Sequence, residues 1–134
     1  MELHFPYGKE TLSIDIDDKN LKGVLVSSLH DYKSQKSPKD LVEKALMNPI
    51  GSERLSKLSE GKKKVVLICS DHTRPVPSKV IVPPMLREIR KGNPDAEVTI
   101  VISTGCHRAT TREELIAKFG EEIVEKENIV IHKA

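Results

Sequence analysis

Two stretches decide the fold of this chain: KVVLICSDHTRP at residues 64–75 and EVTIVISTGCHR at residues 97–108. Each opens with a run of apolar, mostly β-branched residues, which predicts a strand, and each then becomes polar, which predicts a loop. The first run is too continuously apolar for a one-sided sheet, so we expect it to be buried on both faces of a parallel sheet. A shorter run, Ile129 to Ile131, predicts a third strand.

Helical patterns occupy the two intervals between these strands. Residues 78–91 repeat apolar side chains at four-residue spacing, although the pair Pro83-Pro84 is expected to kink that helix. Residues 110–114 contain two overlapping capping-box spacings and predict the start of a second helix that ends at Gly120. Because right-handed crossovers make such strands parallel, the sequence predicts an α/β fold with a Rossmann-like βαβαβ sheet over about residues 64–132.

A small β element and a helix precede this sheet in the sequence. Alternating apolar and polar residues on either side of Gly8 predict a hairpin, and residues 23–26 are a candidate third strand. Ser37 and Pro38 supply an N-cap and a first helical residue, which predicts a helix from about Pro38 to Met47. A short helical segment is expected around residues 54–59. The apolar side chains of the longer helix are expected to be buried: Leu41, Val42, Ala45 and Leu46.

The composition is that of an ordinary globular domain. With 134 residues the chain fits one domain, and 22 Lys plus Arg against 20 Asp plus Glu leave a formal charge of only +2. Aromatic residues make up 3% and Trp is absent, so neither a basic nucleic-acid footprint nor a base-stacking surface is supported. No stretch has the pattern of a membrane span or a signal peptide, and the two cysteines form no disulfide framework. We therefore expect a single cytoplasmic domain, residues 1–134, that binds neither nucleic acid nor membrane.

Both loops follow the carboxyl ends of predicted parallel strands, where ligands bind in open α/β sheets. In the first loop, Asp71 and Thr73 offer hydrogen bonds to a polar ligand, and the guanidinium of Arg74 suits a carboxylate or a phosphate. The alternative interpretation is structural: Asp71 or Thr73 caps the following helix, and Arg74 pairs with an acidic residue. The two interpretations are balanced on these residues alone.

The second loop adds a candidate base and a candidate anion site. Gly105 allows a ligand to approach backbone N–H groups that precede a helix, where an anion is favoured, and Arg108 is a candidate substrate or anion contact. His107 has the side chain whose ordinary pKa suits a general base near neutral pH. A lone loop histidine is more often a solvated or capping residue, but two such loops at one sheet edge favour a functional site.

Two other chemistries are weaker interpretations of these residues. Cys69, His72, Cys106 and His107 could converge as metal ligands, but their spacing matches no structural zinc pattern. We therefore expect no metal site formed by this chain alone. Nucleophilic catalysis by Cys106 lacks any neighbouring group, other than the helix N-terminus, that would lower the pKa of its thiol.

Four motifs occur along the chain in a specific order: PIG at 49–51, SDHTRPVP at 70–77, PPML at 83–86, and TGCHRATTREEL at 104–115 followed by Gly120. An Asp-x-Thr-Arg-Pro loop followed about thirty residues later by a Gly-x-His-Arg loop is not a general α/β pattern. In this order and spacing, the motifs resemble the N-terminal domain of the nickel-dependent lactate racemase family. The resemblance covers essentially the whole chain.

The resemblance implies a two-domain enzyme that inverts the Cα of lactate or a related 2-hydroxy acid. Hydride transfer in this family uses a nickel pincer cofactor built on a pyridinium mononucleotide. The residues implied to contact the cofactor are Asp71, His72, Thr73 and Arg74, and His107 is implied to be one of two acid/base histidines. The cofactor would be held largely by a C-terminal domain, which is the implied partner besides the small substrate.

Some features depart from the family pattern. Cys106 stands where the family usually has Thr or another small polar residue, and His132 matches the family whereas its flanking residues do not. The family's second acid/base histidine, its cofactor-tethering lysine and its nickel-ligating histidine lie beyond Ala134. We therefore expect the isolated chain to be inactive. The alternative function is a non-catalytic module that binds a small anion or a nucleotide.

Overall fold

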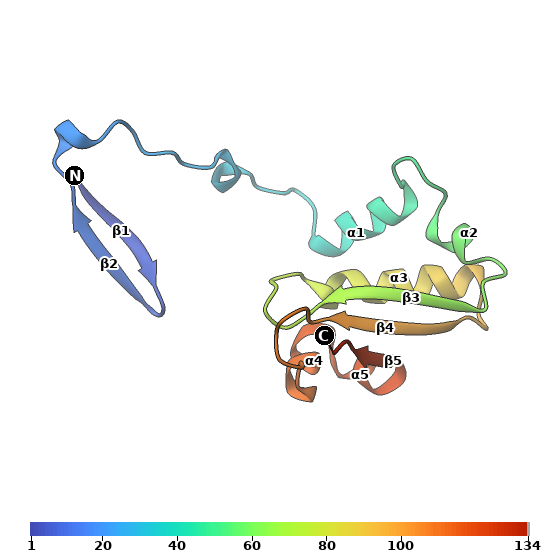
Figure 1. Ribbon diagram of the computed structural model, residues 1–134. Coiled ribbons are helices and arrows are strands. Elements are labelled where there is room, and N and C mark those ends of the chain that lie inside the picture. Colours follow the sequence, from blue (N-terminus) through green and yellow to red (C-terminus); the bar gives the residue numbers. More distant parts are fainter. Residues whose placement is uncertain (134) are drawn as a thin grey trace. The chain divides into compact units, whose positions relative to one another are not determined.

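The computed structural model describes residues 1–133, and the chain folds as two compact units, Met1–Gln35 and the residues from Lys36 onward (Figure 1). The first unit is built on an antiparallel hairpin of β1, Glu2–Tyr7, and β2, Glu10–Asp15, which confirms the predicted hairpin. Gly8 has a φ of 64°, the left-handed conformation that the tight turn requires. Two short 3₁₀ helices follow, Asp18–Asn20 and Ser28–Asp31.

The candidate third strand of this small sheet is wrong. Residues 23–26 pair with neither strand of the hairpin, and the side chain of Leu25 is fully exposed. An apolar, β-branched run forms a strand only where a partner edge is present, and such a partner cannot be identified from the run itself.

The second unit contains the predicted parallel sheet. β3, Lys64–Ser70, pairs with β4, Glu97–Ser103, and β5, Asn128–Ile131, pairs with the other side of β4. α3, Ser78–Gly92, connects the first two strands. α4, Arg112–Phe119, and α5, Glu121–Lys126, connect the last two. The Rossmann-like βαβαβ arrangement is therefore confirmed, with α5 as an element that the sequence pattern did not predict.

The hydrophobic core lies between one face of the sheet and the helices. Register aligns Leu67, Ile100 and Ile129 across the three strands, and these side chains point to the same face. They pack in one cluster with Ile89 of α3 and Phe119 of α4, both almost fully buried. Crossovers of the same hand that proceed in one direction across a sheet place all their helices on one face.

The opposite face of β3 is exposed, so the expectation that this strand is buried on both faces is wrong for the described residues. Val66 is 56% and Ile68 is 76% exposed. The continuous apolar run indicates a strand suited to burial on both faces, but residues 36–133 supply helices for only one of them.

Two helices precede the sheet. α1, Pro38–Met47, has the predicted bounds and the predicted N-cap, with Ser37 Oγ accepting a hydrogen bond from the Asp40 N–H. α2, Leu55–Ser59, follows, and both helices contact α3. The predicted burial of α1 holds only in part, because Val42 and Leu46 are half-buried whereas Leu41 and Ala45 are exposed. Across residues 1–133, every helix is too short or too polar to cross a membrane.

Candidate functional site

Two loops at the carboxyl ends of β3 and β4 form the candidate site. Register pairs Ser70 with Ser103, so the two strands end level with each other. Asp71 therefore begins one loop beside Thr104, which begins the other. The structure thus brings the two predicted loops to the same end of the sheet.

The central feature is a pair formed by a carboxylate and an imidazole. Oδ2 of Asp71 lies 2.5 Å from Nδ1 of His107, although 36 residues separate them. The Asp71 side chain is 1% exposed and that of His107 is 41% exposed, so a surface imidazole reaches a buried acid. Because a carboxylate only accepts hydrogen bonds, Nδ1 carries the hydrogen, and proton exchange with a ligand falls to Nε2.

Thr73 fixes the other oxygen of the same carboxylate. Oδ1 of Asp71 accepts hydrogen bonds from the Thr73 hydroxyl at 2.7 Å and from the Thr73 backbone N–H at 3.1 Å. The Thr73 hydroxyl bond does most to lower the pKa of Asp71 from 3.8 to about 2, burial opposes it, and the bond to His107 adds to it. Asp71 is therefore ionised at neutral pH and holds both Thr73 and His107.

Arg74 follows Thr73 in the first loop and presents a free guanidinium. Its backbone N–H donates to the Asp71 carbonyl at 3.3 Å, and its carbonyl accepts from the Lys118 ammonium at 3.0 Å. Its side chain is exposed and has no hydrogen-bond or ion-pair partner among residues 1–133. The backbone of this residue is thus fixed while its charge remains available to an anion.

Arg108 and His72 both contact Glu114. Arg108 donates to both carboxylate oxygens of Glu114, at 2.9 and 2.6 Å. His72 Nδ1 lies 3.7 Å from Glu114 Oε2 and 3.1 Å from the Thr110 hydroxyl oxygen. The bonds from Arg108, followed by that from the Thr111 N–H, lower the pKa of Glu114 from 4.5 to about 2. The roles predicted for Arg108 and His72 toward substrate and cofactor remain predictions, since both side chains already have partners here.

The backbone of the second loop is held at its start. The Thr104 hydroxyl donates to the His132 carbonyl at 2.6 Å, and the His107 N–H donates to the Thr104 carbonyl at 3.0 Å. Gly105, inside this turn, has a φ of 55°, which favours glycine. These bonds hold the backbone of His107 in place relative to the segment that follows β5. In this position the imidazole of His107 faces Asp71.

The two cysteines lie in different surroundings. Cys69 packs against the core, and burial raises the pKa of its thiol, whereas Cys106 is exposed in the second loop. Within residues 1–133 no group of three or more His, Cys, Asp or Glu side chains is arranged to hold a metal ion. The loops do bring an ionised acid and an imidazole together, which suits proton transfer. The first loop also carries a free guanidinium, which suits an anionic organic group.

Glu114 is the residue of the site that sequence reasoning missed. The capping box that it forms with Thr111 is visible as a spacing and is present in the structure. No sequence pattern indicates the hydrogen bonds that Glu114 accepts from Arg108, because these bonds depend on the path of the loop that precedes α4. Thr110, the other predicted cap, bonds with His72 instead.

Comparison with known proteins gives one consistent family. Residues 7–134 match the family model described as the lactate racemase N-terminal domain. The chain is 52% identical to a lactate racemase of Thermoanaerobacterium thermosaccharolyticum and 49% identical to one of Lactiplantibacillus plantarum, each over 130 residues and 97% of this chain. The chain spans only 30% and 31% of the length of these two relatives.

A solved structure agrees with these matches. The lactate racemase apoprotein of T. thermosaccharolyticum superposes with a TM-score of 0.84 at 49% sequence identity. The superposition covers 99% of this chain and 30% of that chain. The likeness therefore extends to both the sequence and the fold over the whole length compared.

Proposed function

This chain belongs to the lactate racemase N-terminal domain family, and on that premise we propose that it supplies one acid/base histidine and an anion contact to a racemase of lactate or a related 2-hydroxy acid. The observation that carries the proposal is the hydrogen bond between Asp71 and His107. The bond orients an exposed imidazole, and the ionised carboxylate stabilises the imidazolium that forms when Nε2 takes a proton.

His107 is proposed to act on the hydroxyl group of the substrate. When the hydroxyl group at Cα loses its proton to His107, Cα can release its hydrogen as a hydride to an acceptor. In the reverse step, Cα takes back the hydride and the oxygen takes back the proton. Inversion needs such a group on each face of Cα. His107 serves one face, and the remainder of the enzyme is proposed to supply the group for the other.

Hydride transfer requires an acceptor, and no amino-acid side chain is one. We propose that a nickel pincer cofactor supplies this acceptor when bound. The free guanidinium of Arg74 fits the anionic, nucleotide part of such a group, because a guanidinium binds phosphate. Asp71 is an ionised carboxylate bonded to Thr73, so it is proposed to hold this loop in place beside the cofactor and not to contact the phosphate. The residues of this chain are thus proposed to orient the cofactor while a C-terminal domain holds it.

The test joins residues 1–134 of this chain to the part of T. thermosaccharolyticum lactate racemase that lies beyond the matched region. This chimera, supplied with cofactor, is assayed for interconversion of D- and L-lactate beside the unaltered relative and the isolated chain. Racemisation by the chimera and none by the isolated chain supports the proposal. A folded, cofactor-loaded chimera without activity contradicts it and favours a non-catalytic anion-binding module.

A further inference from the structure

One edge and one face of the parallel sheet are open within residues 36–133. β3 pairs only with β4, so the backbone groups along its other edge have no partner strand in this part of the chain. On the face away from the helices, register places Ile68, Val101 and Val130 side by side, and Ile68 and Val130 are exposed. Parallel sheets ordinarily have such apolar faces covered.

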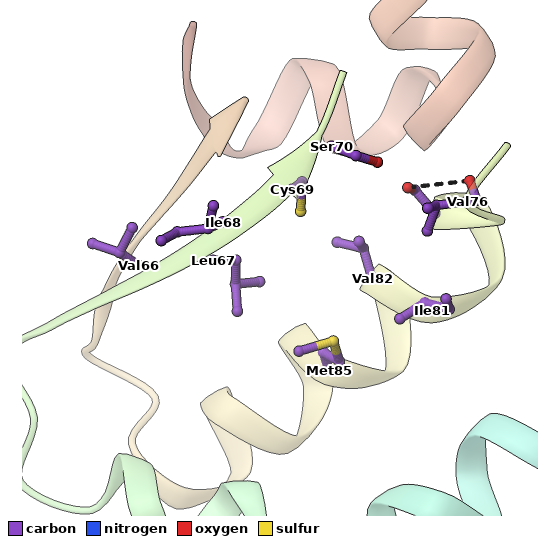
Figure 2. A pocket seen from close by; sticks show the side chains of 10 residues that line it. Val66, Leu67, Ile68, Cys69, Ser70, Val76, Ile81, Val82 and Met85 are labelled. Carbon is purple, nitrogen blue, oxygen red and sulfur yellow. Dashed lines mark hydrogen bonds between the residues drawn. The ribbon is translucent and has the colours of Figure 1, made fainter. Parts of the chain in front are cut away.

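A groove of about 390 Å³ lies beside the open edge (Figure 2). β3 forms one wall from Val66 to Ser70, and Ile81 and Met85 of α3 form the other. At the carboxyl end of β3, the Ser70 hydroxyl oxygen is buried without a hydrogen-bond partner among residues 1–133. A strand added along this edge would pair with the open backbone groups of β3 and place side chains against the groove.

The order of the strands indicates which kind of segment fits. β3, β4 and β5 follow one another in a single direction across the sheet, and their crossover helices share one face. In a doubly wound sheet, the next crossover covers the other face and returns the chain to the open edge of the first strand. The exposed face and the open edge of β3 are the two surfaces that such a continuation would cover.

We propose that this open surface, defined as the β3 edge with Val66, Ile68 and Val130, binds the polypeptide that follows the matched region in the longer members of the family. That polypeptide contributes a helix over the exposed face and a strand parallel to β3. The chain spans only 30% of the length of the T. thermosaccharolyticum relative, so the remainder of that protein has enough polypeptide to form this helix and this strand. The inference rests on the proposed function, since it assigns the place of the C-terminal partner.

This placement also positions the ligand. The direction of winding would reverse between β3 and the added strand, and ligands of open α/β sheets bind at that point, outside the carboxyl ends of the strands. Asp71 to Arg74 follow the carboxyl end of β3 directly. The partner strand would therefore end beside these residues and bring its own side chains to the other side of the ligand.

Hydrogen exchange measured by mass spectrometry tests the proposal without reference to activity. The amides of residues 64–70 are compared between the isolated chain and the chimera, with residues 97–103 of the central strand as the internal reference. We expect exchange across residues 64–70 to slow at least tenfold in the chimera, relative to that reference, as the second edge of β3 becomes paired. Equal exchange in both proteins would overturn the proposal.

A pair of variants of the chimera provides a second measurement. Ile68→Asp places a charge on the open surface, whereas Leu58→Asp places one on an exposed apolar residue of α2 outside it. We expect Ile68→Asp alone to lower the thermal midpoint of the chimera while leaving that of the isolated chain unchanged. Equal effects of the two variants on the chimera contradict the proposal.

The activity assay and the exchange measurement distinguish this inference from the proposed function. An inactive chimera with protected β3 amides refutes only the proposed function. An active chimera with unprotected β3 amides refutes only this inference.

Discussion

The Nδ1 atom of His107 lies 2.5 Å from the Oδ2 atom of Asp71, across two loops that follow neighbouring parallel strands. The bond joins a buried, ionised acid to an exposed ring, so the ring has a fixed orientation while one nitrogen remains at the surface. An acid/base group needs both properties, because its geometry must be set before the ligand arrives and its proton must still reach the ligand.

Replacing His107 by Ala should abolish most activity of the chimera. Loss of a positioned acid/base group lowers kcat by about 10²- to 10⁴-fold. The measurement is the initial rate of lactate racemisation in each direction, and His30→Ala, an exposed histidine of the first unit, is the matched control. Equal rates for the two variants would exclude an acid/base role for His107.

The carboxyl group of Asp71 should titrate with a midpoint near 2, well below its ordinary pKa of 3.8. Because the pKa is lower in the folded chain, ionised Asp71 stabilises the fold above the ordinary value, and this stabilisation is lost as the pH falls from 3.8 toward 2. Carbon-13 NMR of the side-chain carboxyl reports the midpoint. Between pH 3.8 and 2, the thermal unfolding temperature of Asp71→Asn should depend less on pH than that of the control Asp95→Asn. A titration midpoint of the Asp71 carboxyl near 3.8 would contradict the assigned hydrogen bonds.

Arg74 should bind small anions in the isolated chain. Its guanidinium is free, so titration with lactate, phosphate or a pyridinium mononucleotide is expected to shift the amide resonances of residues 71–74 and 104–108. Arg74→Ala should weaken binding at least tenfold, about 1.4 kcal/mol. Lys79→Ala removes one positive charge from the nearby start of α3 and should leave the affinity within about twofold. The same loss in both variants would indicate nonspecific attraction.

Glu114→Gln should disturb the site without removing any proposed ligand contact. Arg108 would lose its paired carboxylate and His72 its nearby negative charge, so we expect the kcat/KM of the chimera to fall about tenfold. NMR shifts of His72 and Arg108 report the structural change directly. Glu113→Gln, in the same turn of α4 but outside these contacts, is the control. Unchanged His72 and Arg108 resonances in Glu114→Gln would show that Glu114 does not hold them.

Truncating a side chain of the core should destabilise the chain more than truncating a half-exposed apolar side chain. Ile100 of the central strand is fully buried, and Ile100→Ala is expected to lower the free energy of unfolding by about 2 to 5 kcal/mol. Leu58→Ala, at a half-exposed position of α2, should cost less than about 1 kcal/mol. Urea denaturation of the isolated chain measures both values. Similar losses for the two variants would contradict the core described here.

Much of the fold follows from local sequence patterns, because those patterns report short-range chemistry. The alternation on either side of Gly8 predicted the hairpin, Ser37-Pro38 predicted where α1 begins, and the apolar runs at 64–70 and 97–103 predicted two parallel strands. Residues 23–26 show the limit of this reasoning. Their side chains favour a strand, but pairing needs a second edge that the run itself does not specify.

The sequence by itself determined the polar side chains of the candidate site: an acid, a hydroxyl, a guanidinium and an imidazole placed directly after two strands of one parallel sheet. The tertiary structure decided how they combine. It joined Asp71 to His107, left Arg74 free and bound Arg108 to Glu114. It also showed that one face of β3 is exposed. These outcomes depend on the register of strands that are 30 or more residues apart and on the path of each loop, which come from packing and hydrogen bonding between distant segments rather than from local preference.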